Sequence, residues 1–540
     1  MIKKVRSGYR VMSTRGEPQD LPHQSGSRAA PSTGRDLRAH AAKIMRPPGH
    51  AKSPAYPTNG SVSPVAEPVC LPAFLREVFP GAQVVETHIS WVFLTEEHAY
   101  KVKKPVSLGF LDFLTLARRR HFCAEEVRLN RRLAPDTYLG TKEIKRSGRT
   151  IEVAVWMHRL PADRMLDRLV AEGRADDALM EKIGRVIADF HAVAGHGRAI
   201  NHYGSRGVIA RNWRENFAQT RRFPSDVLRP DVRDAVSAYV ARFLREHGRH
   251  FAARARAGRI RDCHGDLQAQ HVCCTEPIRV YDCIEFNHRF RYGDTASEIA
   301  FLMMDLDALG RPDLAMDFLN AYLDASGDYA GVPLLDFYRA YRAWVRGKVL
   351  GLQGPAQRQR AHDYFALAAG YVASRRAPRL IVMSGLMGSG KTTLARRLSH
   401  ADGVVVRTDA VRRQVAGVPW HRRSEAGFGE GLYTSEMTAR TYARCLEVAR
   451  DLLTSGWSVI LDGVFGRRAE REAVRALTRE VGVPIRIIWC DAPEEVLRDR
   501  IRRRTADAED LSEGRDDLLD LQKARYEPPV GEPAVLRVTP

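Results

Sequence analysis

The stretch RLIVMSGLMGSGKTTLAR, residues 379–396, decides the fold of the C-terminal part of the chain. It begins with four apolar residues, Leu380 to Met383, in a run typical of a buried parallel strand. Glycines follow at positions 385, 388 and 390, and a helical pattern opens at Lys391. This spacing fits G-x-x-x-x-G-K-[ST], in which backbone N–H groups curl around phosphate oxygens at a helix N-terminus. The sequence therefore predicts a nucleotide-binding site here.

The polar residues of this loop have separate expected roles. Lys391 is expected to reach the terminal phosphates, and Thr392 is expected to ligate Mg²⁺. The residues expected to contact the nucleotide are Gly385, Gly388, Ser389, Gly390, Lys391, Thr392 and Thr393.

Length and composition set broad limits. A chain of 540 residues is too long for one hydrophobic core, so two or three domains are expected. No apolar run is long enough to cross a bilayer, and we expect no membrane partner. The 8 cysteines are scattered, match no standard zinc motif and follow no secretory signal. They indicate free thiols in a reducing, cytoplasmic compartment.

The positive charge indicates anionic partners. The net charge is +20, which nucleotides would explain as well as nucleic acid would. Only 13 of the 85 basic residues are lysine. Where arginine is the default, a lysine marks a site that needs a compact, flexible point charge. Lys391 is one such residue, and Lys101, Lys103 and Lys104 form a second cluster.

Residues 1–68 are predicted to be a disordered basic tail, because they are rich in Ser, Pro, Gly and Arg and lack apolar periodicity. The arginine-rich, acid-poor start also fits a transit peptide. A third interpretation is a start codon assigned too early, for which Met45 is a candidate for the true start.

Removal of residues 1–68 is expected to leave the melting temperature unchanged, because this composition cannot bury enough apolar surface to offset chain entropy. The measurement compares thermal melting of the full chain with that of a protein starting near Val69. A drop of many degrees would show instead that the tail packs on the rest of the chain.

A strand lysine and a helix glutamate suggest a second phosphate site. Two strands, joined at Glu96–Glu97, are predicted in residues 84–106, with Lys101 and Lys103 on one face of the second strand. A helix over residues 116–133 carries Glu126 and its neighbour Glu125. Protein-kinase-like folds hold the α- and β-phosphates with such a pair, although a solvated ion pair is the alternative.

The stretch CHGDLQAQHVCCTEPIRVYDCIEFN, residues 263–287, strengthens this interpretation. Phosphoryl transfer needs a loop aspartate near the acceptor hydroxyl and a strand-end aspartate on the metal. The stretch resembles the aminoglycoside phosphotransferase family, whose loop reads H-G-D-x-x-x-x-N before a later metal-binding aspartate. It is most similar to a bacterial group of bifunctional kinase and AAA-family ATPase proteins marked by YKxKKPV, LNRRLAP and DCIEFN, here at residues 100–106, 129–135 and 282–287.

The resemblance implies a role for each matching position. Asp266 would orient or deprotonate the acceptor hydroxyl, and Asp282 would hold Mg²⁺. Lys101, with Lys103 as the alternative, would bind phosphates and pair with Glu126.

One position departs from the family pattern. His271 stands where the loop usually has asparagine, and we include it among the metal-site residues. Imidazole is a poor ligand for a hard ion such as Mg²⁺. A one-metal site and a domain that only binds nucleotide therefore stay open as interpretations.

The C-terminal part alternates strands and helices, which predicts a parallel sheet. A second strand, residues 403–407, leads to Asp409 and Arg412, and a third ends at Asp462, a Walker B-type metal residue. A fourth strand lies within residues 485–493. This part resembles small P-loop kinases of the gluconate kinase, shikimate kinase and polynucleotide 5′-hydroxyl kinase type. The resemblance implies that Asp409 contacts the acceptor hydroxyl and that Arg412 holds an anionic substrate group.

An arginine-rich helix precedes the acidic stretch TADAEDLSEGRDD, residues 505–517. This pattern fits a lid that closes over transferring phosphates, with Arg500 and Arg504 as its candidate catalytic residues. The alternative is an arginine-rich helix face.

The predicted fold is mixed: a protein-kinase-like α+β two-lobed domain over residues 69–375, then an α/β P-loop domain with a parallel sheet over residues 376–540. The predicted function is an ATP- and Mg²⁺-dependent kinase with two nucleotide sites and a small-molecule hydroxyl acceptor. A nucleotide-binding regulatory protein with a degenerate first domain is one alternative. A nucleic-acid 5′-hydroxyl kinase is another, which is not favoured because no basic platform with interleaved aromatic residues is present.

Overall fold

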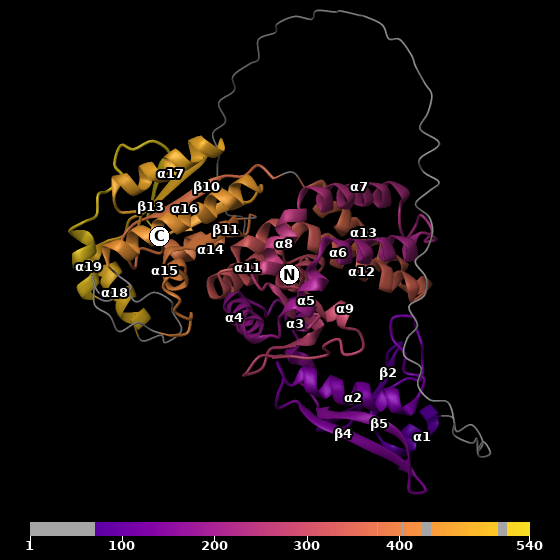
Figure 1. Ribbon diagram of the computed structural model, residues 1–540. Helices are drawn as coiled ribbons and strands as arrows, with labels where there is room; N and C mark the ends of the chain where they lie inside the picture. The colour runs from indigo at the N-terminus through magenta and orange to yellow at the C-terminus, as the bar shows by residue number, and fades with distance from the viewer. Residues whose placement is uncertain (1–70, 375, 402, 423–433, 506–515, 540) are drawn as a thin grey trace, which may run out of the picture. The chain divides into compact units, whose positions relative to one another are not determined.

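The computed structural model describes residues 71–374, 376–401, 403–422, 434–505 and 516–539 (Figure 1). The predicted disordered tail, residues 1–68, lies outside these ranges, and so does most of the predicted lid segment. The residues from Cys70 onward form one compact unit. Within the described ranges, no helix has both the length and the apolar character needed to cross a bilayer.

A five-stranded antiparallel sheet, in the order β1-β2-β3-β5-β4, forms the N-terminal lobe. Its strands are β1 (Gln83–Glu86), β2 (Ser90–Leu94), β3 (His98–Lys103), β4 (Tyr138–Arg146) and β5 (Arg149–His158). The lobe also contains helices α1 (Leu71–Val78) and α2 (Leu116–Asn130), and α2 packs on β4 and β5 (Figure 1).

The prediction of two strands in residues 84–106 was wrong, since the structure has three. Thr87 causes the additional turn, because its hydroxyl accepts a hydrogen bond from the Ser90 N–H at 2.9 Å and donates to the Ser90 carbonyl at 3.1 Å. Such side-chain bonds to the local backbone compete with strand pairing.

The second lobe is mainly helical. Its helices are α3 (Leu166–Ala171), α4 (Asp177–Val193), α5 (Arg198–Asn201), α6 (Arg206–Thr220), α7 (Pro230–Glu246), α8 (Gly248–Arg256), α9 (His288–Arg291), α10 (Thr295–Ala308), α11 (Pro312–Ser326), α12 (Leu335–Leu352) and α13 (Arg358–Ala373). Short strands β6 (Ile260–Asp262), β7 (Val272–Cys273), β8 (Arg279–Val280) and β9 (Tyr292–Asp294) frame the HGD loop. Helix α10 is buried almost all round, and the middle of the helix, residues 299–304, is wholly apolar.

The C-terminal region contains a five-stranded parallel sheet in the order β11-β12-β10-β13-β14. The strands are β10 (Leu380–Ser384), β11 (Gly403–Arg407), β12 (Ser458–Asp462), β13 (Ile485–Cys490) and β14 (Val535–Val538). The helices are α14 (Lys391–Ser399), α15 (Thr408–Ala416), α16 (Ser435–Thr454), α17 (Arg468–Val481), α18 (Glu494–Thr505) and α19 (Asp516–Lys523). The predicted fold class, a two-lobed kinase-like region before a parallel-sheet P-loop region, is confirmed.

Candidate active sites

The phosphate loop between β10 and α14 has the backbone that its glycines predict. Gly385, Gly388 and Gly390 have φ values of 143°, 77° and 84°. A Cβ atom on Gly385 would lie 2.3 Å from the Cys490 carbonyl oxygen, and one on Gly388 would lie 2.8 Å from that of Leu497. Only glycine satisfies both the backbone angles and these close approaches.

The side chains of the loop are arranged around the N-terminus of α14. Lys391 is the first residue of this helix, and its ammonium group donates to the Leu386 carbonyl at 2.7 Å. The Ser389 hydroxyl is buried without a hydrogen-bond partner among the described residues. Thr393 is exposed on the helix. A helix N-terminus, a lysine and an unsatisfied buried hydroxyl together fit a nucleotide phosphate.

A candidate metal site adjoins this loop. The Thr392 hydroxyl donates to Asp462 Oδ2 at 2.8 Å, and Asp462 is the last residue of β12 with 5% of its side chain exposed. Hydroxyl and carboxylate oxygens are the ligands that Mg²⁺ prefers, so the donor set fits this ion.

The predicted acceptor residues follow β11. Asp409 is half-buried on α15, and Arg412 is buried one turn later and donates to the Thr438 hydroxyl at 3.1 Å. On α18, Arg500 donates to the Gly388 carbonyl at 3.3 Å and so contacts the phosphate loop. The side chain of Arg504 lies outside the described residues.

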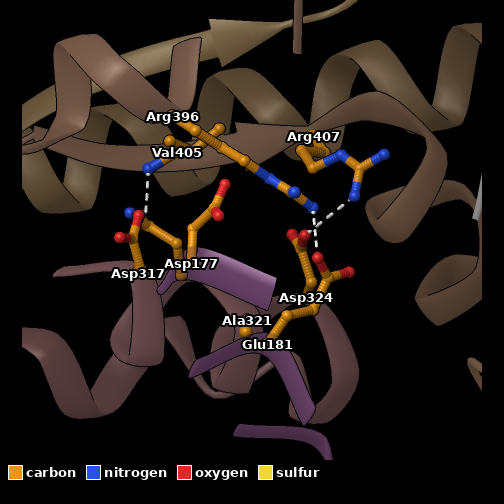
Figure 2. Close-up of a pocket in the computed structure, with 9 residues that line it drawn as sticks. Asp177, Glu181, Asp317, Ala321, Asp324, Arg396, Val405 and Arg407 are labelled. Atoms are coloured by element: carbon orange, nitrogen blue, oxygen red, sulfur yellow. Dashed lines mark hydrogen bonds and ion pairs between the residues drawn. The ribbon is translucent and has the colours of Figure 1, made fainter. Parts of the chain in front are cut away.

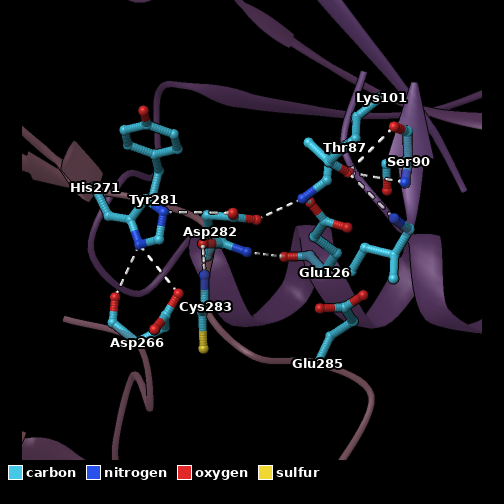
Figure 3. A network of polar contacts seen from close by, with 12 residues as sticks. Thr87, Ser90, Lys101, Glu126, Asp266, His271, Tyr281, Asp282, Cys283 and Glu285 are labelled. Carbon is cyan, nitrogen blue, oxygen red and sulfur yellow. Dashed lines mark hydrogen bonds and ion pairs between the residues drawn. The ribbon is translucent and has the colours of Figure 1, made fainter. Parts of the chain in front are cut away.

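The second cluster of charges joins β3 and α2 of the N-terminal lobe to the segment after β8 in the second lobe (Figure 3). The Lys101 ammonium lies 2.9 Å from Glu126 Oε1 and forms an ion pair with Asp282. Lys103 lies 2.6 Å from Glu126 Oε2 and pairs with Glu285. The Lys101 side chain is 13% exposed and that of Lys103 is 1% exposed, so Lys101 is the lysine that a ligand can reach. The sequence alone did not decide which of these two lysines is the candidate for binding phosphate.

The electrostatics of this cluster keep Lys101 charged. Desolvation would lower the pKa of Lys101, but the carboxylates of Asp282, Glu126 and Glu285 raise that pKa well above its ordinary value. Asp282 has a φ of 65°, a left-handed value that is uncommon outside glycine. With this backbone conformation, the Asp282 carboxylate faces Lys101.

His271 lies between the two aspartates that the sequence singled out (Figure 3). Its Nδ1 is 2.9 Å from the Asp266 carbonyl oxygen and 3.4 Å from Asp266 Oδ2, and its Nε2 is 3.7 Å from Asp282 Oδ2. Because a carbonyl oxygen only accepts, we assign the proton of the neutral ring to Nδ1. Asp282 fits Mg²⁺ as a ligand, whereas the imidazole is a poor one.

Sequence reasoning missed the residues that hold the HGD loop in place. Glu298 on α10 accepts hydrogen bonds from the N–H groups of His264 and Gly265 at 2.6 and 2.9 Å. Arg342 on α12 donates to the Gly265 carbonyl at 3.1 Å. A glutamate inside the apolar run TASEIAFLMM was the signal that could have indicated this role, since a buried charge needs partners.

Potential ligand atoms of His191, Cys263 and Glu298 lie within 4.8 Å of one another behind this loop. Both oxygens of Glu298 already accept backbone N–H groups, and the His191 ring contacts the Tyr322 hydroxyl at 3.0 Å. Burial raises the pKa of the Cys263 thiol well above its ordinary value. We therefore interpret this group of residues as a structural support of the HGD loop.

Two family models match the chain. The phosphotransferase enzyme family matches residues 95–347, and the AAA domain matches residues 380–529. Proteins from Mycobacterium tuberculosis and Mycobacterium bovis, each described as uncharacterised, are 36% identical over 441 residues, which is 80% of this chain and 88% of theirs. An alignment of that length extends over both regions. The chain belongs to their family. We refer to it below as the phosphotransferase–AAA family.

Two further similarities each cover part of this phosphotransferase–AAA protein. A probable adenylyl-sulfate kinase of Aeropyrum pernix is 33% identical over 120 residues, 22% of this chain and 62% of that protein. A choline/ethanolamine kinase family protein from Mesorhizobium loti has a solved structure with a TM-score of 0.36 and 13% identity, covering 55% of this chain and 90% of that one. Both regions of the chain are kinase-like, and such families use ATP with Mg²⁺.

Proposed function

We propose that this phosphotransferase–AAA protein is an ATP-dependent phosphotransferase with two nucleotide sites, which transfers phosphate to hydroxyl groups of small molecules. The observation that carries the proposal is that in each region a candidate phosphate-binding lysine lies at, or next to, a contact with a candidate metal-binding carboxylate. Lys101 meets Asp282 across 181 residues of sequence, and the helix that begins at Lys391 places Thr392 against Asp462. We assign these sites to domains over residues 69–375 and 376–540.

In the first site, Lys101 holds the phosphates and Glu126 orients Lys101. Asp282 would hold Mg²⁺, which supplies charge neutralisation on the phosphates when it is bound. Asp266 orients the acceptor hydroxyl and accepts its proton. Gln268 supports this role, because its amide donates to Asp266 Oδ1 at 2.6 Å and fixes the carboxylate.

In the second site, the backbone of the phosphate loop and Lys391 hold the transferring phosphate, and Thr392 with Asp462 would hold Mg²⁺. Arg500 is close enough to the loop to stabilise charge that develops on the phosphate. Asp409 orients the acceptor hydroxyl, and Arg412 binds an anionic group of the acceptor. The similarity to a probable adenylyl-sulfate kinase supports a small anionic acceptor at this site.

The test is a screen of hydroxyl-bearing metabolites for ATP consumption by the full chain. Activity that disappears in Asp266→Asn belongs to the first site, and activity that disappears in Lys391→Ala belongs to the second. Acceptor-dependent activity that survives both substitutions together would contradict the proposal.

His271 favours a second candidate function, in which the first region binds nucleotide without transferring phosphate. If His271 only replaces a better metal ligand, His271→Asn should raise Mg²⁺-dependent turnover at the first site by about tenfold, the lower end of effects seen around metal ligands. The measurement uses a chain that also carries Lys391→Ala, so that only the first site contributes. Nucleotide binding serves as the control and should not change.

The opposite result would assign His271 a positive role. If His271→Asn abolishes turnover that the Lys391→Ala chain still has, the imidazole takes part in the reaction and is not a degenerate ligand.

A further inference from the structure

Helix α11 of the kinase-like region contacts the edge strand of the P-loop sheet. The Asn320 side-chain oxygen accepts a hydrogen bond from the Val405 N–H of β11 at 2.9 Å. This contact satisfies a backbone donor on an edge that would otherwise be unpaired. Around it lies a small cavity whose charged lining residues are Asp177, Glu181, Asp317, Asp324, Arg396 and Arg407.

One of these contacts continues to the proposed magnesium site. Arg407 Nη1 lies 3.1 Å from Asp324 Oδ2 on α11, and Arg407 Nε lies 3.6 Å from Asp462 Oδ2. The same oxygen of Asp462 accepts the hydrogen bond of Thr392. The side chains of Asp324, Arg407 and Asp462 are 11%, 5% and 5% exposed, so solvent screens these charges weakly.

The register of the sheet explains why Arg407 can reach both carboxylates. Arg407 and Asp462 are the last residues of neighbouring parallel strands and pair directly across the ladder. Asp324 approaches the same guanidinium from α11 (Figure 2). One guanidinium group is therefore shared between two carboxylates.

We propose that Asp324 is a positioning residue for the magnesium site of the P-loop region, because it holds Arg407 in this shared position. The inference rests on the proposed function of that site. When Asp462 binds the ion, Arg407 keeps Asp324 as a carboxylate partner, which offsets part of the cost of its buried charge. Without Asp324, the guanidinium loses one of its carboxylate partners, pairs more strongly with Asp462 and competes with Mg²⁺ for that carboxylate.

The P-loop site then depends on Asp324, which lies outside the part of the chain that matches the AAA family model, residues 380–529. The kinase-like region thereby supplies part of the second site's supporting structure. Any other protein that carries the P-loop residues without α11 would lack this partner of Arg407.

The test measures how binding of a non-hydrolysable ATP analogue to the full chain depends on Mg²⁺ concentration. Only the binding that is lost in Lys391→Ala is counted, which isolates the second site. Burial raises the pKa of Asp324 to about 6, although Arg407 lowers it, so the carboxylate is ionised at pH 8, where the titration is made.

Asp324→Asn is expected to raise the Mg²⁺ concentration for half-maximal binding by about tenfold, as for other outer-shell partners of metal ligands. The matched control is Asp317→Asn on the same helix, whose partner is His400 Nε2 at 3.0 Å. This control should leave the Mg²⁺ dependence unchanged. In a chain that already carries Arg407→Gln, Asp324→Asn should not change the Mg²⁺ dependence further, because Asp324 is proposed to act on the site through Arg407.

The outcomes separate the two proposals. If the parent has no Lys391-dependent, Mg²⁺-dependent binding, the proposed function of the site fails. If the parent shows this binding but Asp324→Asn leaves its Mg²⁺ dependence unchanged, as Asp317→Asn should, the positioning role is wrong. The role is also wrong if Asp324→Asn still shifts the Mg²⁺ dependence in a chain that carries Arg407→Gln. Should Asp324→Asn melt far below the parent, Asp324→Ser replaces it, with the same shift in Mg²⁺ dependence expected.

Discussion

Lys391→Ala is expected to lower phosphoryl transfer at the P-loop site by about a hundred- to a thousandfold, the loss that follows removal of one group aimed at developing charge. Lys391 begins α14 and donates to the Leu386 carbonyl of the phosphate loop, where the proposed function places the transferring phosphate. The measurement is turnover of the acceptor found for this site, in a chain that carries Asp266→Asn to silence the first site.

Lys523→Ala is the control for this loss. Lys523 is in the same region and pairs with Glu494 on the surface, so its removal should leave turnover unchanged. Equal turnover in Lys391→Ala and Lys523→Ala would contradict the assignment of Lys391.

Asp266→Asn is expected to lower turnover at the first site by about a hundred- to ten-thousandfold, the range for loss of a general base. Asparagine preserves the shape of the side chain but cannot accept the proton of the acceptor hydroxyl. Nucleotide binding should persist, because Lys101 and Asp282 are unchanged. The measurement is turnover in a Lys391→Ala chain, together with titration of the ATP analogue.

A surface aspartate of the same region, Asp136, provides the comparison for Asp266. Asp136 is 52% exposed and pairs with Arg279, so Asp136→Asn should have little effect on turnover. A loss of ATP-analogue binding in Asp266→Asn would mean that Asp266 supports the nucleotide site and not the acceptor.

Local sequence predicted most of the strands and the phosphate loop, because strand, glycines and Lys391 follow one another within residues 379–396. It did not predict β14, a short strand that pairs with β13 at the edge of the sheet. It also did not predict the turn at Thr87, where one hydroxyl group bonds to the Ser90 backbone between the first strand and the second.

The supporting residues of the sites were harder to predict, since their partners are distant in sequence. Glu298 binds the backbone 34 residues earlier at His264, and Asp324 meets Arg407 83 residues later. Neither contact produces a periodic pattern in the amino-acid sequence. The sequence does mark Glu298 as a charge in an apolar helix, but only the packing of α10 against the loop identifies its partner.

The most direct test of the two-site account is calorimetric titration of the full chain with a non-hydrolysable ATP analogue and Mg²⁺. The account predicts two binding sites in the parent and one in Lys391→Ala, with the remaining site lost when Lys101→Ala is added. Separate sets of phosphate-binding groups should make the two losses independent. A parent with one site that disappears entirely in Lys391→Ala would contradict the account, because the kinase-like region would then bind no nucleotide.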